Sequence, residues 1–255
     1  MRRLVGAGAV VASGGVAQRE EILARLPCGP TAIDVRRVSR ARRMTLRVPP
    51  GGARPVVTIP LRAPLPAAER FVASQSGWLA ARLAERSPTV AFADGAVVPL
   101  RGVPHVVRAT GTVRGVVRVG AEQDGPTLWV PGAPEHLPRR LRTWLTSEAR
   151  ADLTAAVAHY AARVARTPTA VRVKDTRAQW GSCSPTGVLS FSWRLVLAPP
   201  FVLRYVAAHE VAHLVELNHS PAFWRLNALL DPQHARARAW LRTNGRALHA
   251  VGVTP

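Results

Sequence analysis

The sequence predicts an α+β fold with two lobes: a β-rich N-terminal lobe that also holds helices, and a C-terminal lobe of helices beside a sheet. Three observations favour this fold class. Short segments with alternating apolar and polar residues, separated by glycines, dominate residues 31–132. Long segments with an apolar residue every three or four positions dominate residues 133–250. The second range also contains apolar segments of strand length, which supply the sheet that its helices cover.

Residues 1–30 are expected to form a flexible extension that carries no chemistry. Its first part, Met1–Gly15, has arginines followed by small apolar residues, a pattern that resembles a weak signal peptide with a cleavage site near Ala17. Glycine and alanine make this segment poorly hydrophobic. We therefore favour a disordered extension, or a start site placed too far upstream.

The N-terminal lobe is expected to begin with two strands within residues 33–61, joined by a turn at Gly51–Gly52. An amphipathic helix follows at residues 66–87. Its apolar side carries Phe71, Trp78, Leu79 and Leu83. Short strands separated by glycines then run from residue 94 to about residue 130.

The C-terminal lobe is expected to alternate helices with two strands, and Pro168 and Pro200 mark two of the boundaries. The expected elements are, in order, a helix at 133–166, a strand at 169–175, a turn around 180–183, a strand at 187–196, a helix from Pro200, a helix at 221–230 and a basic helix at 233–249.

Composition places the protein among globular proteins without a membrane segment. The hydrophobic fraction is 47%, and no apolar run approaches the length needed to span a bilayer. The two cysteines, Cys28 and Cys183, make no disulfide framework, which agrees with a reducing compartment. We therefore expect a cytoplasmic location.

The formal net charge of +20 raises the question of nucleic-acid contact. Lys174 is the only lysine, so the excess of arginine reflects a general preference for that residue. One denser group lies in the first lobe. It consists of Arg36, Arg37, Arg40, Arg42 and Arg43. Contact with nucleic acid through this arginine-rich surface is therefore kept as a secondary possibility, and a solvated face is the simpler interpretation.

The segment Tyr205–Trp224 contains the motif His-Glu-x-x-His, at His209, Glu210 and His213. Residues four apart lie on one helix face, so both imidazoles point the same way. Two neutral imidazoles at this spacing can bind one Zn²⁺, and the glutamate between them can then take a proton from water. The simpler alternative is a pair of ordinary histidines on a partly buried helix.

A catalytic zinc needs a third protein ligand and an open position. His219 is the first candidate, because Ser220 is a plausible N-cap and Pro221 suits the first position of a new helix. The chain therefore turns there and can bring His219 back to the metal. Further candidates rank lower. They are Glu216, Asp231 and His234.

Four sequence blocks, in their order and spacing, resemble the YgjP-like metallopeptidases, which are similar in turn to the SprT-like proteases. The blocks are WGSC at 180–183, LSFSWRLVLAPP at 189–200, YVAAHEVAHL at 205–214 and NHSPAFW at 218–224. The chain departs from the usual family pattern at two positions. Gln179 stands where the family has arginine, and Ser192 stands where it tends to have asparagine.

The resemblance implies a zincin-like catalytic lobe and a zinc-dependent metalloendopeptidase-type hydrolase that acts on proteins or peptides. Zn²⁺ would be held by His209, His213 and His219, with Glu210 as general base. Candidate substrate contacts are Trp180, Gly181, Ser182, Arg194 and Tyr205. Candidate donors to the oxyanion are Tyr205, Arg194 and Arg204.

Two other functions remain open at the level of sequence. One is a zinc hydrolase that acts on a non-peptide substrate, since three ligands and a water serve many hydrolyses. The other is a basic zinc-containing module that binds nucleic acid, in which a fourth protein ligand would close the metal site.

Overall fold

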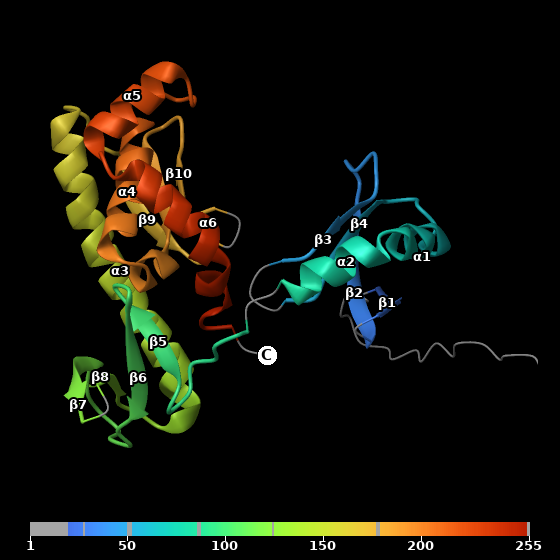
Figure 1. Ribbon diagram of the computed structural model, residues 1–255, viewed down its shortest axis with the longest axis horizontal. Coiled ribbons are helices and arrows are strands. Elements are labelled where there is room, and N and C mark those ends of the chain that lie inside the picture. Colours follow the sequence, from blue (N-terminus) through green and yellow to red (C-terminus); the bar gives the residue numbers. More distant parts are fainter. Residues whose placement is uncertain are drawn as a thin grey trace, which may run out of the picture. The chain divides into compact units, whose positions relative to one another are not determined.

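The computed structural model describes residues 20–27, 29–49, 53–85, 88–123, 125–176 and 179–253. These residues form helices and separate sheets, which confirms the α+β class. The chain divides into two compact units (Figure 1). Unit 1 comprises residues 1–48 and 54–81, and unit 2 comprises residues 49–53 and 82–255. No helix in the described part of the chain has the length and apolarity needed to cross a membrane.

Unit 1 is built on a four-stranded sheet with the order β1-β2-β4-β3. Its strands are β1 (Glu21–Leu26), β2 (Gly29–Val38), β3 (Thr45–Arg47) and β4 (Val56–Pro60). Alternation in β1 buries every second residue, as a half-buried strand requires. This strand lies within the range expected to be a flexible extension, and residues 1–19 lie outside the described residues.

Two helices follow the sheet of unit 1, where the sequence predicted one. They are α1 (Leu65–Ser74) and α2 (Ser76–Ala84). The last residues of α2 belong to unit 2. The helix breaks at Gln75, a polar position between two serines.

Of the arginine-rich group, Arg37 is held by Glu20 at 2.8 Å and by two backbone carbonyls. Nucleic-acid contact remains a prediction.

Unit 2 contains two sheets joined by the long helix α3 (Leu137–Arg163). The first sheet has the order β5-β6-β8-β7. Its strands are β5 (Val97–Leu100), β6 (Val103–Ala109), β7 (Arg118–Glu122) and β8 (Gly125–Val130). A short turn, η1 (Pro134–His136), leads into α3, which extends from this sheet to the opposite end of the unit (Figure 1).

The second sheet has the order β10-β11-β9, with β11 antiparallel to β10 and parallel to β9. Its strands are β9 (Ala170–Lys174), β10 (Gly181–Cys183) and β11 (Val188–Ser192). The predicted turn at residues 180–183 is therefore an edge strand in its last three residues. Four further helices complete the unit. They are η2 (Trp193–Leu197), α4 (Pro200–Ala212), α5 (Pro221–Leu230) and α6 (His234–Ala250).

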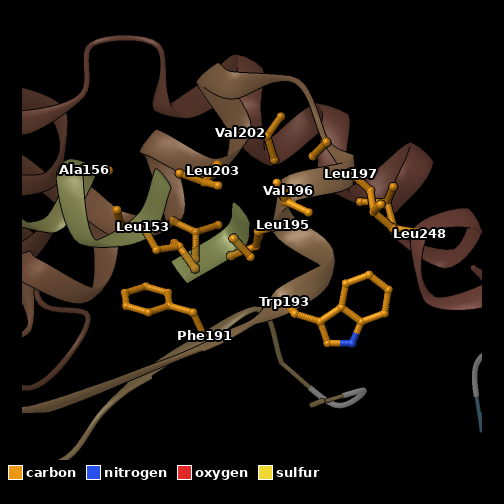
Figure 2. Packing of buried hydrophobic residues seen from close by; sticks show 14 of the residues in the cluster. Leu153, Ala156, Phe191, Trp193, Leu195, Val196, Leu197, Val202, Leu203 and Leu248 are labelled. Atoms are coloured by element: carbon orange, nitrogen blue, oxygen red, sulfur yellow. The ribbon is translucent and has the colours of Figure 1, made fainter. Parts of the chain in front are cut away.

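The core of unit 2 lies where α3, η2 and α4 meet (Figure 2). Leucines four apart on α3 are completely buried and form the stripe that the sequence predicted. Each stabilises the fold by about 2 kcal/mol through removal of its side chain from water. They pack with residues of η2 and α4, so α3 holds α4 in place. The contacts shown in Figure 2 include Leu153, Leu195, Val196, Val202 and Leu203.

The turn between β5 and β6 docks onto the segment that precedes α4. The backbone N–H groups of Arg101 and Gly102 donate to the carbonyls of Val196 and Leu197, at 2.7 and 3.1 Å. Gly102 has φ +81°, and a Cβ at this residue would meet Pro199 at 2.8 Å. The first sheet therefore belongs with unit 2, whereas the sequence placed residues 94–130 in the N-terminal lobe. The sequence could not show that this sheet belongs with unit 2, because backbone hydrogen bonds between distant segments do not depend on amino-acid composition.

Candidate metal centre

Helix α4 carries the His-Glu-x-x-His motif on its last turn. Pro200 is the first residue of the helix, where a missing N–H costs nothing, and alanine and valine fill much of the interior. The helix is buried on nearly all sides, because it contacts α3, α5, α6 and β10. Rigid packing of this kind fixes the directions in which His209, Glu210 and His213 project from the helix.

The chain after α4 turns back, as the sequence predicted. The Nδ1 atom of His213 lies 2.9 Å from the carbonyl oxygen of Glu216. Ser220 caps α5 by accepting a hydrogen bond from the N–H of Phe223 at 3.3 Å, and Pro221 is the first residue of that helix. The turn between the two helices places the Nε2 atom of His219 3.1 Å from that of His209.

The three imidazoles of His209, His213 and His219 meet around one point. One nitrogen from each ring lies within 4.8 Å of the others. Tetrahedral zinc with Zn–N bonds near 2.0–2.1 Å separates its ligand nitrogens by about 3.3 Å, so the observed spacing fits one such ion. No fourth carboxylate, thiol or imidazole joins this group among the described residues. The donor set therefore leaves a position open for water or substrate.

The tautomer of His213 also fits metal binding. Because the Glu216 carbonyl can only accept, Nδ1 of His213 carries the hydrogen and Nε2 presents its lone pair. For His209, Nδ1 is buried and meets no hydrogen-bond partner among the described residues. Its ring is held by packing, between Tyr205 with centroids 5.8 Å apart and Phe223 at 4.9 Å.

Two aromatic residues of α5 form the wall behind the imidazoles. Phe223 stacks on His213 with centroids 4.4 Å apart and also contacts the other two rings edge-on. Trp224 stacks on His219 at 5.6 Å. An apolar wall of this kind excludes water and limits the movement of each ligand.

Burial keeps two of the three histidines, His209 and His213, in the form that binds metal. Desolvation, together with the neighbouring imidazoles, lowers the pKa of His209 to about 3. Burial also lowers the pKa of His213. A neutral imidazole has a free lone pair, so at neutral pH neither of these residues has to lose a proton before it can coordinate an ion.

Glu210 lies beside this group, with its carboxyl against the backbone of β10. Its exposed fraction is 5%, and burial raises the pKa of the carboxyl to about 8. A Cβ on Gly181 would lie 2.5 Å from Oε1 of Glu210. Only a glycine at residue 181 leaves room for the Glu210 carboxyl where it lies, which explains in physical terms why the WGSC motif has a glycine.

A cavity of about 380 Å³ opens next to Glu210. Figure 1 shows the elements around it, α4, α6 and β10, at the end of unit 2 away from the β5–β8 sheet. The lining residues are Trp180, Gly181, Tyr205, Val206, His209, Glu210, Arg238, Leu241 and Arg242. The side chain of Trp180 stacks on His249 with centroids 4.2 Å apart, so it packs β10 against α6 as well as lining the cavity.

The structure places several other predicted residues away from this cavity. Arg194 is completely buried, forms an ion pair with Asp175 and donates to the carbonyl of Val251. It therefore holds β9, η2 and the end of the chain together, because a buried guanidinium needs a carboxylate partner. Arg204 is exposed and lines a different cavity, beside Tyr160.

Ser182 lies on β10, where it pairs with Ser190 of β11, and is not among the described residues that line the cavity. The side chains of the lower-ranked ligand candidates do not join the group of three imidazoles. They are Glu216, Asp231 and His234. Conversely, nothing in the sequence indicated that Arg238 and Arg242 line the cavity, since α6 is one of several arginine-rich segments.

The fold and the site define a class of protein, a metallohydrolase with two histidines and a glutamate on one helix and a third histidine from the following turn. Residues 42–244 match the family model described as YgjP-like, metallopeptidase domain. This match covers most of the chain, and the protein belongs to the YgjP-like family. A metal ion, usually zinc, is implied by membership of a metallopeptidase family, and the donor set above fits it.

Among solved structures, the chain is similar to a metallopeptidase zymogen, abylysin of Pyrococcus abyssi. The two sequences are 19% identical, the match covers 35% of this chain and 93% of that chain, and the TM-score is 0.32. A search of curated proteins gave no match.

Proposed function

We propose that the protein is a zinc-dependent peptidase in which His209, His213 and His219 hold the metal and Glu210 is the general base. The observation that carries this proposal is the convergence of the three ligand nitrogens within 4.8 Å, beside a buried glutamate and an open cavity. Membership of the YgjP-like metallopeptidases supports the peptide bond as the target. The endopeptidase type and the cytoplasmic location stay predictions.

When bound, zinc would act as a Lewis acid that acidifies water and polarises a carbonyl group. Glu210 then accepts the proton of the attacking water and delivers it to the nitrogen of the leaving amine. The buried carboxyl, with its pKa raised to about 8, would lose its own proton more readily beside a cation, because an opposite charge favours the ionised form. The contact with Gly181 fixes the orientation of the carboxyl during both transfers.

Tyr205 is the donor that we propose for the oxyanion. It lines the cavity and lies against His209, one helical turn before it. Burial raises the pKa of its hydroxyl to about 12, so the group keeps its hydrogen at neutral pH and can donate a hydrogen bond. Arg194 and Arg204, the other candidates, do not line the cavity.

Strand β10 is the element that we propose to align the substrate. Within its sheet β10 pairs with β11 and has no second neighbour among the described strands. An extended peptide can add to such an edge through main-chain hydrogen bonds, which do not depend on the side chains of the peptide. The contact between Gly181 and Glu210 would bring the added strand next to the general base.

Metal analysis and peptide hydrolysis test the proposal together. We expect the purified protein to bind one zinc ion and to cleave an unstructured protein such as casein. His219→Ala should lose most of the zinc. Glu210→Gln should keep the zinc and lose about 10²–10⁴-fold in rate, the usual contribution of a general base.

His136→Ala is the matched control, because His136 is exposed on η1 and lies outside the group of three imidazoles. This variant should retain both zinc and activity. Full activity of the Glu210→Gln variant would contradict the assignment of the base. Unchanged zinc content of the His219→Ala variant would contradict the ligand set.

A further inference from the structure

Two arginines that the proposed mechanism does not use line the cavity beside Glu210. Arg238 and Arg242 lie four residues apart on α6, and residues at this spacing share a helix face. Both residues are exposed. The two arginines therefore form part of one wall, and α4 with Tyr205 and His209 forms another.

Neither arginine has a carboxylate partner in the described part of the chain. The next arginine along the same helix, Arg246, does have one, since it pairs with Glu85 at 2.7 Å. Glu210 lies in the same cavity, but burial alone accounts for its raised pKa and no ion pair joins it to either arginine. The cavity thus has two arginines that form no ion pair with a carboxylate of the described residues.

The position of Arg238 is fixed by an aromatic contact. Its guanidinium carbon lies 4.6 Å from the centre of the Trp224 ring, and Trp224 in turn stacks on His219. A cation over an indole face is attracted by the negative face of the ring.

We propose that Arg238 and Arg242 form a subsite for a carboxylate group of the peptide substrate. This inference rests on the proposed peptidase function and specifies its substrate class. A guanidinium group binds a carboxylate through two parallel hydrogen bonds, and two such groups one turn apart favour an anionic ligand over its neutral amide. The cavity volume is at the lower end for ligand sites and suits one side chain or one chain end.

The carboxylate can come from two sources, an aspartate or glutamate side chain or the free C-terminus of the peptide. Peptides that differ only in one Glu or Gln at each position, with an amidated C-terminus, test the first source. The same peptides with a free or amidated C-terminus, and with Gln throughout, test the second. We expect kcat/KM of the zinc-loaded protein to be at least about tenfold higher for the carboxylate member of one of these pairs.

Arg238→Met and Arg242→Met remove the charge but keep a long apolar side chain. Each should reduce the preference for carboxylate over amide by about tenfold through KM, measured as the ratio of kcat/KM between the two members of a peptide pair. Arg236→Met is the matched control. Arg236 is exposed on the same helix, but its guanidinium lies 4.3 Å from the ring of Phe201 and it does not line the cavity.

A binding measurement on the metal-free protein separates this inference from the proposed function. Fluorescence of Trp180 and Trp224, which lie at the cavity and beside it, reports the dissociation constants of the same peptide pairs without any hydrolysis. If no peptide is cleaved, the proposed function fails. Selective carboxylate binding that depends on both arginines would still support the subsite. Equal affinity and equal kcat/KM for acid and amide peptides in the wild type would overturn it.

Discussion

The carboxyl group of Glu210 lies directly against the backbone of Gly181, so closely that a Cβ at residue 181 would be 2.5 Å from Oε1. Glu210 comes from α4 and Gly181 from the edge strand β10. The contact joins the helix that carries the proposed metal ligands to the strand that we propose to align the substrate. It has a direct consequence for mutagenesis, because the atom that would be displaced belongs to the proposed general base.

Gly181→Ala is predicted to move the Glu210 carboxyl without unfolding the protein. The colliding atoms belong to a side chain, which can rotate, and Gly181 does not have a positive φ. A displacement of about 1 Å in a catalytic group can lower the rate about 10²-fold. Peptide hydrolysis should fall by this order, and metal analysis should show unchanged zinc. Gly77→Ala, at a glycine with open space around it, is the control. Wild-type activity of Gly181→Ala would contradict the role of this contact.

Phe223→Ala is predicted to weaken both the fold and zinc binding. Phe223 is completely buried and touches all three imidazoles. Removal of a buried phenylalanine costs about 3–5 kcal/mol of unfolding free energy, and the imidazoles lose the surface that orients them. Urea unfolding and a zinc titration measure the two effects. Phe223→Leu keeps most of the volume and should retain more of both. Zinc affinity that is equal in all three proteins would show that Phe223 acts only in the fold.

The zinc affinity is predicted to fall less steeply with decreasing pH than it would at a site of three histidines with ordinary pKa values. Desolvation lowers the pKa of His209 to about 3, so this ring remains neutral when an ordinary histidine, with a pKa near 6.5, takes up a proton. Desolvation also lowers the pKa of His213. Between pH 6 and 4, competition from protons should therefore involve fewer than three ligands. Zinc affinities measured across this range should give fewer than three protons released per ion. A slope of three would contradict the prediction.

The ion pair between Arg194 and Asp175 gives a prediction for stability. Burial raises the pKa of Asp175, but the hydrogen bond and charge of Arg194 outweigh burial and hold the pKa below its usual value. A lowered pKa in the folded state means that the pair stabilises the protein above pH 4, and that this contribution is lost as the pH falls through the folded-state pKa. Asp175→Asn leaves a buried guanidinium without its carboxylate, which should cost about 3 kcal/mol at pH 7.

Urea unfolding at pH 7 and at pH 3 measures this contribution. The difference between the wild type and Asp175→Asn should shrink at the lower pH. Arg194→Met, which removes the buried charge and keeps an apolar side chain of similar length, should cost less than Asp175→Asn at pH 7. A larger loss for Arg194→Met would show that packing of the arginine, including its contact with Trp193 at 4.5 Å, outweighs the ion pair.

Local patterns in the sequence predicted the ligand geometry well. The spacing of His209 and His213 indicated one helix face, and Ser220 with Pro221 indicated the helix start that returns His219. Each of these signals acts over a few residues, through side-chain periodicity or capping, and so can be read from a short segment. The leucine stripe of α3 could be predicted for the same reason, because it depends on the spacing of leucines along one segment.

The cavity wall and the partner of Arg194 could not be predicted, because both depend on contacts between segments far apart in sequence. Arg194 was a candidate for substrate binding. In the structure it forms an ion pair with Asp175 on the preceding loop. Arg238 and Arg242 share their composition with several exposed arginines elsewhere, and only the packing of α6 beside α4 distinguishes them.

The docking of the Arg101–Gly102 turn on the residues before α4 bears on how the protein can be shortened. A fragment that starts at residue 133 would contain every proposed metal ligand, but it would expose the carbonyls of Val196 and Leu197 and the apolar surface that the first sheet of unit 2 covers. A minimal folded fragment must therefore begin upstream of β5, near residue 88, even though no described residue before 180 lines the cavity.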